Sequence, residues 1–285
     1  MLMRTRNTPA SLLAAAAASR PRPAWAAAAR RLLAPLRALA WAWLVPGLML
    51  LLWWLAAREA WVPPQVLPPP VEVAAALQGL VASGELWPHT LISVQRVALG
   101  FAAGAGLGLL LGAAMGLSPL ARDYLHPSFK ALAQVPVLGW LPLLMLLVGI
   151  DEALKWLLIA KAALVPVALN TMQGLQSVPS RYIELARVLG YTRWQRLSRV
   201  LFPAALAPIW TGLRYGLTHA WLALVVVELL ASSEGLGFLI IYGRQLFQLE
   251  LVMAAVIVVG AFGWALDRLL AAIEARLLRW RREAF

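Results

Sequence analysis

The 285-residue chain contains no cysteine and only three histidines. Without cysteine it can form no disulfide, no thiolate metal site and no cysteine nucleophile. The histidines, His89, His126 and His219, are too scattered in the sequence to suggest a metal site, and no bound metal is expected. No Ser-His-Asp, His-x-x-x-His or paired-carboxylate arrangement stands out, so a membrane enzyme is the weakest functional hypothesis.

A nucleotide-binding loop is also missing. The pattern G-x-x-x-x-G-K-[ST] needs a lysine after glycine, and none of the three lysines, Lys130, Lys155 and Lys161, has that context. Any ATP that the protein uses must therefore bind to another subunit. We expect this chain to carry no cofactor of its own and no catalytic residue.

Charged residues make up only 13% of the chain, against 62% hydrophobic residues, and the mean hydropathy is +0.75. This composition predicts an all-α polytopic membrane protein with no room for a sizeable soluble domain. The third and fourth of the six expected spans are short and are interrupted by proline, so they should be kinked helices shielded by protein. They are 135–150 with Pro136 and Pro142, and 154–170 with Pro166. The other spans are expected at 41–57, 97–117, 213–232 and 251–270.

The sequence divides into a transmembrane domain, 41–270, and two basic tails, 1–40 and 271–285. The first tail is rich in alanine and arginine and is expected to be retained rather than cleaved as a signal peptide. With six spans, the segments on the side of the termini hold twenty of the 25 lysines and arginines. This bias places both termini in the cytoplasm. It also accounts for the net charge of +12, so nucleic acid is not expected as a partner.

Five glycines recur every fourth residue in the second expected span: Gly100, Gly104, Gly108, Gly112 and Gly116. Each glycine in a helix interior costs about 1 kcal/mol relative to alanine, so the row needs a packing reason. Ordinary close packing of two membrane helices and a sliding surface in a moving transporter are both compatible with it.

The segment 180–203 is a basic island in this hydrophobic chain. Ser180 is expected to cap a short helix, and Gly190 to end it in the left-handed conformation. Thr192 and Gln195 have capping-box spacing for a second short helix, and Pro203 bars a simple continuation of that helix. The arginine-rich face could lie on anionic lipid headgroups or dock on a protein.

The island also resembles a family signature. The order Glu184, Ala186, three residues, Gly190, nine residues, Val200, one residue, Phe202, Pro203 is similar to the cytoplasmic "EAA, x3, G, x9, I, x, LP" motif of ABC importer permeases. Leu185 stands in place of the central alanine and Phe202 in place of the leucine. The resemblance extends over residues 62–267 and looks like the aliphatic sulfonate, taurine and nitrate branch.

The resemblance implies a type I importer permease of a bacterial inner membrane. Its coupling residues toward a separate ATPase would be Glu184, Leu185, Ala186, Arg187, Gly190 and Pro203. Two copies of the chain would form a homodimer with two ATP-binding subunits, which hold ATP and magnesium, and an external substrate-binding protein. That binding protein would select the substrate.

Two ionisable residues, Lys161 and Glu228, lie well inside expected spans and should face protein or water. They could pair with each other, or Glu228 could act at a subunit interface or gate and Lys161 could attract an anion. With Trp140 and His219 they form the candidate translocation-pathway set. The main alternative to an ATP-driven importer is a proton-coupled secondary transporter that uses Lys161 and Glu228.

Overall fold

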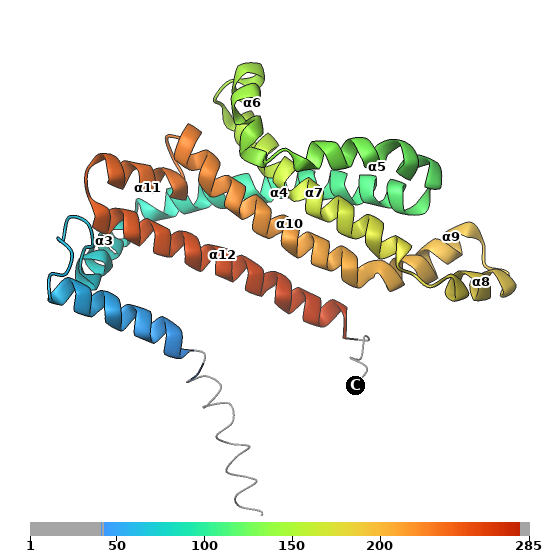
Figure 1. Cartoon of the computed structure of the whole chain (residues 1–285), viewed down its shortest axis with the longest axis horizontal. Helices are drawn as coiled ribbons and strands as arrows, with labels where there is room; N and C mark the ends of the chain where they lie inside the picture. Colours follow the sequence, from blue (N-terminus) through green and yellow to red (C-terminus); the bar gives the residue numbers. More distant parts are fainter. Residues whose placement is uncertain (1–40, 42, 280–285) are drawn as a thin grey trace, which may run out of the picture. The chain divides into compact units, whose positions relative to one another are not determined.

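The computed structural model describes residue 41 and residues 43–279. It contains helices but no strand in that part of the chain (Figure 1). Its contacts divide it into two units, and the first, up to Val62, contains one apolar helix, Trp43–Arg58. The second unit, from Pro63, contains α3 (Pro70–Ala82), α4 (Leu86–Leu117), α5 (Pro119–Gln134), a 3₁₀ turn (Val137–Trp140), α6 (Leu141–Val148), α7 (Glu152–Gln176), α8 (Ser180–Val188), α9 (Arg193–Arg196), a π-helical turn (Leu197–Leu201), α10 (Phe202–Ala231), α11 (Leu236–Gln245) and α12 (Leu249–Leu277).

Helix α7 is central to the second unit, because it packs against both α4 and α10, while α12 packs against α10, α11 and α3 (Figure 1). The α7 side chains Ile159 and Ala163 are fully buried and join Leu224 of α10 and Leu236 of α11 in the largest hydrophobic cluster. Helix α7 runs through Pro166 without a break. At that point the Asn170 amide donates a hydrogen bond to the Pro166 carbonyl at 2.8 Å.

Among the described residues, three helical stretches are long and apolar enough to cross a membrane: Leu86–Leu117, Arg193–Ala231 and Leu249–Leu277. The expected span 135–150 is not one helix. Instead, α5 and the segment Val137–Val148 meet at a bend of 90°, and together they would count as a fourth span. The bend occurs because Pro136 fixes an extended backbone, and the residue before it, Val135, is also extended.

The expected domain ends are only partly within the described residues. The tail 1–40 lies outside them. Helix α12 continues beyond the expected end of the last span at residue 270, as far as Leu277. The first seven residues of the expected C-terminal tail are therefore helical.

The glycine row of α4 faces α7 along its whole length. A Cβ atom added at Gly100 would meet Ile159, and one at Gly108 would lie 2.9 Å from the Leu164 carbonyl oxygen. At the remaining three glycines an added Cβ atom would come within 2.9 Å or less of α7, at Ala160 for Gly104, Ala168 for Gly112 and Leu175 for Gly116. The row is thus a packing ridge that lets two backbones approach more closely than any side chain would permit.

Candidate functional site

The turn between α8 and α9 has the geometry that its residues predict. Gly190 adopts φ +75°, and the Tyr191 amide donates to the Ala186 carbonyl at 3.0 Å, which closes α8 in a Schellman-type cap. The Gln195 amide then donates to the Thr192 hydroxyl at 3.2 Å, and the Thr192 amide donates to the Gln195 side chain at 2.9 Å. The expected capping box is therefore present.

Two details of this segment differ from expectation. Ser180 is the first residue of α8 and not its cap; the cap position is Pro179, which makes no side-chain hydrogen bond. Pro203 does not stop the second helix, because a π-helical turn over Leu197–Leu201 connects α9 to α10 and places Pro203 in the first turn of α10. In that turn a missing backbone N–H costs little. The second helix is consequently the beginning of the 39-residue stretch that ends at Ala231.

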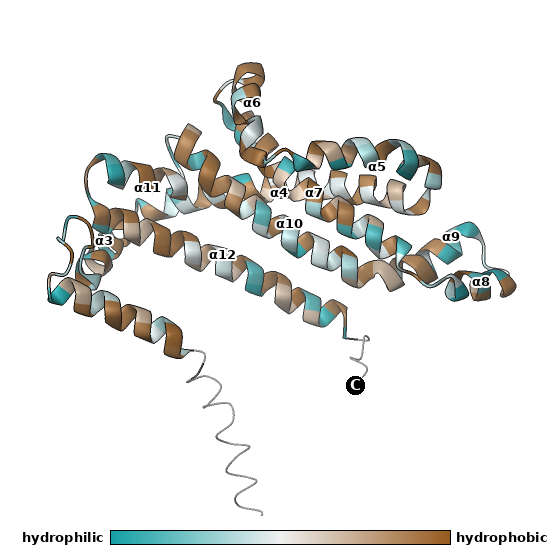
Figure 2. Cartoon of the chain, viewed as in Figure 1, coloured by the Kyte–Doolittle hydropathy of each residue, from teal (hydrophilic) through white to brown (hydrophobic). Residues whose placement is uncertain are grey.

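Helix α8 presents an apolar surface to its surroundings. Leu185 is 56% exposed and Val188 85% exposed, while Ala186 is turned inward and buried. Glu184 and Arg187 are also exposed. Figure 2 shows hydrophobic and hydrophilic residues mixed along α8 and α9. Large exposed apolar side chains rimmed by charge are typical of a surface that binds a partner.

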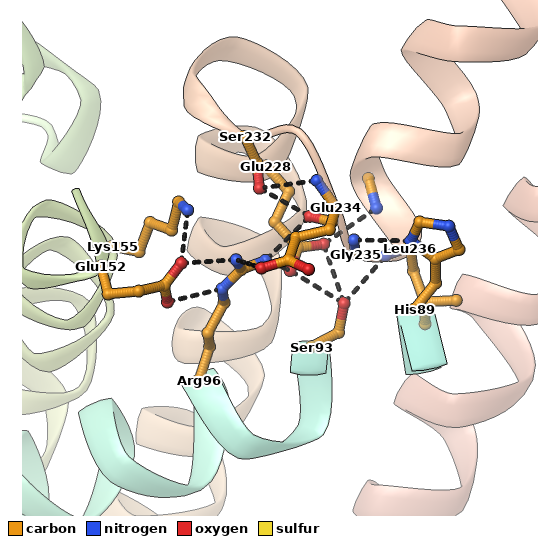
Figure 3. Close-up of polar contacts among 11 residues, drawn as sticks. His89, Ser93, Arg96, Glu152, Lys155, Glu228, Ser232, Glu234, Gly235 and Leu236 are labelled. Atoms are coloured by element: carbon orange, nitrogen blue, oxygen red, sulfur yellow. Dashed lines mark hydrogen bonds and ion pairs between the residues drawn. The ribbon is translucent and has the colours of Figure 1, made fainter. Parts of the chain in front are cut away.

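A second polar centre lies near the last turn of α10, around the fully buried carboxylate of Glu228 (Figure 3). This carboxylate accepts hydrogen bonds from the guanidinium of Arg96 at 2.8 Å and from the hydroxyl of Ser93 at 2.8 and 2.9 Å. Arg96 is also buried, with 1% of its surface exposed. A pair with Lys161 was one of the alternatives left open by the sequence, and the structure shows instead that Glu228 pairs with Arg96.

The same guanidinium joins two further acidic residues. Its Nε and Nη2 atoms donate to the two oxygens of Glu152 at 2.8 and 2.6 Å, and its Nη1 atom also donates to the Glu234 carbonyl at 2.8 Å. Lys155 lies on the other side of Glu152 at 2.6 Å. Arg96 thereby connects α4 to the start of α7, to α10 and to the loop that follows α10.

The first turn of α11 is fixed to this centre by its backbone. The Gly235 amide donates to His89 Nδ1 at 2.9 Å, the Leu236 amide to Ser93 Oγ at 2.8 Å, and the Gly237 amide to Glu228 Oε2 at 2.9 Å. The first amides of a helix lack internal partners and carry partial positive charge, so they stabilise the buried carboxylate. Gly235 is required here, because its φ is +111° and a Cβ atom would overlap the Glu228 carboxylate.

The four candidate pathway residues do not converge on one site. Lys161 lies 5.5 Å from the ring centre of Trp140 and donates to the Val135 carbonyl at 2.5 Å. His219 is exposed on α10, where its Nδ1 atom contacts the Tyr215 carbonyl at 2.8 Å. Glu228 belongs to the buried charged centre.

Comparison with known proteins places this architecture in a family. Residues 104–279 match the family described as binding-protein-dependent transport system inner membrane component. The chain belongs to this family of permeases.

Several curated relatives are similar over most of the permease. An aliphatic sulfonates transport permease protein of Bacillus subtilis (strain 168) is 42% identical over 84% of this chain and 86% of its own length. The taurine transport system permease protein of Escherichia coli (strain K12) is 37% identical over 83% and 88%, respectively. An aliphatic sulfonates transport permease protein of the same strain is 36% identical over 84% and 90%.

The central residue of the charged centre, Arg96, was not predicted as a site residue from the sequence. The expected spans place it in a loop on the outer side, just before the span 97–117. A signal for it is present, since His89, Ser93 and Arg96 precede Gly100 at spacings of four, three and four. These spacings continue the glycine ridge toward the start of α4. Extending the ridge indicates that Arg96 faces the protein interior.

Proposed function

We propose that this permease is the membrane subunit of an ATP-driven importer for aliphatic sulfonates or a related small anion. The relatives named above support the substrate class, because sulfonates and taurine share a sulfonate group. In this proposal two copies of the chain form the pathway, two ATP-binding subunits hold ATP and magnesium, and an external binding protein delivers the substrate. The chain itself has no enzymatic activity.

The observation that carries the proposal is the surface of α8. Its exposed Leu185 and Val188, with Glu184 and Arg187 beside them, are held rigidly by the Gly190 turn and the capping box. Helix α8 is joined to α9, which continues through a π-helical turn into α10. A movement of α8 is therefore transmitted to the first turns of a long membrane helix. ATP binding then shifts the permease toward an outward-facing state. The size of the shift is limited by the free energy by which ATP binding favours that state over the inward-facing one.

The orientation follows from the same proposal. If α8 docks on a cytoplasmic ATPase, the last turn of α10 and the charged centre around Glu228 lie toward the outer face of a bacterial inner membrane. Both termini then lie in the cytoplasm, in agreement with the distribution of lysine and arginine. Lipid surrounds the dimer, and nucleic acid has no part in the function.

The proton-coupled alternative requires Lys161 and Glu228 to act together, but each has other hydrogen-bond partners in the structure. Glu228 accepts hydrogen bonds from Arg96, Ser93 and the Gly237 amide, and Lys161 donates to a backbone carbonyl. Glu228 is also fully buried, so the two residues do not form the relay that this alternative requires.

Uptake should therefore depend on ATP and not on a proton gradient. In vesicles that contain the permease, its ATPase and the binding protein, uptake of radiolabelled ethanesulfonate is expected to require ATP on the ATPase side and to persist after an uncoupler collapses the gradient. Uptake that stops with the uncoupler while ATP is held constant would favour the secondary transporter.

Gly190→Val should separate the permease from its ATPase without preventing membrane insertion. Valine at φ +75° is strained by about 1–2 kcal/mol, which should open the turn that positions α8. The expected result is a normal level of permease in the membrane with strongly reduced co-purification of the ATPase and reduced uptake.

Gly84 offers a matched control for this experiment. It has φ +78° and, like Gly190, has open space around its Cα. However, it lies between α3 and α4 rather than beside α8. Gly84→Val should introduce a similar strain and leave ATPase binding intact. Equal loss of ATPase in both variants would argue against α8 as the docking surface.

A further inference from the structure

Lys161 occupies the middle part of a long helix of the membrane domain. It is the tenth residue of α7, which has 25 residues, so it lies about 14 Å along a helix of about 37 Å. The residues that follow it, Ala162 and Ala163, are buried in the core, whereas Lys161 itself is half-buried. In the expected span 154–170, a lysine this far from the helix ends would cost roughly 2.5–3.5 kcal/mol on insertion scales, so its presence calls for a reason.

Its surroundings provide no negative charge. The ammonium group donates one hydrogen bond, to the Val135 carbonyl, and lies over the ring of Trp140. By contrast, three other cations in the helical core are each paired with carboxylates: Arg96 with Glu152 and Glu228, Lys155 with Glu152, and Arg214 with Asp267 and Glu274. In the part of the chain that the structure describes, no carboxylate forms an ion pair with Lys161.

Hydrogen-bond donors at this position outnumber acceptors. The ammonium group has three N–H donors and uses one of them on Val135. The indole Nε1 atom of Trp140 is buried and has no hydrogen-bond partner among the described residues. Buried polar groups in proteins nearly always have partners, so the buried indole N–H of Trp140, beside an uncompensated positive charge, indicates an acceptor that comes from outside the chain.

The break between α5 and α6 explains how the lysine is held while such an acceptor is absent. Pro136 ends α5 and leaves the Val135 carbonyl without a helical partner. This carbonyl holds the ammonium group in place and offsets part of its charge. Discontinuous helices of this kind form binding sites in other membrane transporters because their free backbone groups and nearby charges face a cavity.

We propose that Lys161 binds the anionic group of the substrate during its passage through the permease, with Trp140 beside it. This inference rests on the proposed function and adds the residue that recognises the charge. An alkanesulfonate would accept hydrogen bonds from the two free N–H groups of Lys161 and neutralise its charge. The Val135 carbonyl takes over again when the anion leaves, so binding is transient.

The test compares two substitutions of Lys161 with a control in the complete transporter. Lys161→Arg keeps the charge, Lys161→Gln keeps a hydrogen-bond donor without charge, and Lys130→Gln removes an exposed lysine of α5 as the control. The measurement is the initial rate of ethanesulfonate uptake into proteoliposomes at saturating binding protein, together with basal ATPase activity and Tm. Lys161→Gln should lower uptake about tenfold or more, the effect of losing one charge-assisted interaction with the migrating anion.

A role in charge recognition differs measurably from a purely structural one. Lys161→Arg should retain most of the uptake, Lys130→Gln should retain all of the uptake and the basal ATPase activity, and Lys161→Gln should keep a wild-type Tm. Wild-type uptake by Lys161→Gln would overturn this inference but leave the proposed function standing. The inference would also be overturned if both Lys161 variants lost Tm and uptake together, as expected of a residue that only caps the broken helix. If the wild-type complex imported no sulfonate, the proposed function itself would fail and the inference with it.

Discussion

Gly104→Leu is expected to prevent recovery of a folded permease, whereas Gly106→Leu, two residues away on the same helix, should be tolerated. A Cβ atom at Gly104 would overlap the Ala160 carbonyl oxygen and lie 2.8 Å from the Ala160 Cα atom. These are backbone atoms of α7, which cannot rotate away as a side chain could. A Cβ atom at Gly106 meets nothing within 4 Å.

The magnitude follows from the cost of overpacking. Extra methylene groups in a close-packed core cost about 1–3 kcal/mol when neighbouring side chains can adjust, and more when a backbone must move. Gly104→Leu must separate α4 from α7, and Gly104→Ala should already lower the Tm of the detergent-purified complex. The measurement is that Tm, with the amount of permease in the membrane. A Tm for Gly104→Leu equal to that of Gly106→Leu would mean that the glycine ridge does not contact α7.

The glycine ridge shows what could be predicted from the sequence. Spacings of four place residues on one ridge of a helix, so the existence of a packing face follows from geometry within α4 alone. The partner helix does not follow, because any neighbour with small residues would satisfy the same pattern. Only the fold identifies α7, with Ala160, Val167 and Ala168 opposite the glycines.

The turn between α8 and α9 could be predicted for a similar reason. The Gly190 conformation and the capping box of Thr192 and Gln195 involve residues no more than five positions apart. The second helix was expected to be short, but it continues into α10. The missing N–H of Pro203 falls in the first turn of α10, after a π-helical turn that no local pattern indicates. Short-range chemistry determines caps and turns, whereas the continuity of a helix depends also on the residues beyond the turn.

The charged centre could not be predicted from local patterns. Arg96 is separated from its hydrogen-bond partners by 56 residues for Glu152, 132 for Glu228 and 138 for Glu234. A buried carboxylate requires a countercharge, and that rule holds for Glu228. However, Lys161 lies at a depth in its expected span comparable to that of Glu228, so depth alone favours the wrong partner. Depth along a span does not show which faces of two helices meet.

Arg96→Met should be among the most destabilising single substitutions in the permease. It leaves the carboxylate of Glu228, which is fully buried, without its countercharge. Removing one member of a buried ion pair typically costs about 3–5 kcal/mol, because the other charge remains in a medium of low dielectric constant. We expect a large loss of permease from the membrane and a markedly lower Tm. Arg244→Met, on the exposed face of α11, is the control and should change neither.

A double-mutant cycle separates the ion pair from the rest of the centre. Glu228→Gln should be milder than Arg96→Met, since glutamine can still accept hydrogen bonds from Ser93 and the Gly237 amide, and Arg96 keeps its two bonds to Glu152. In the Glu228→Gln background, Arg96→Met no longer leaves a buried charge unpaired opposite α4. The loss of Tm in the double variant should therefore be smaller than the sum of the two single losses. Because Glu228 fixes the first turn of α11 and carries no protons in the proposed mechanism, whatever uptake Glu228→Gln retains should still require ATP and resist an uncoupler. Strictly additive losses would mean that Arg96 and Glu228 contribute to stability independently of each other.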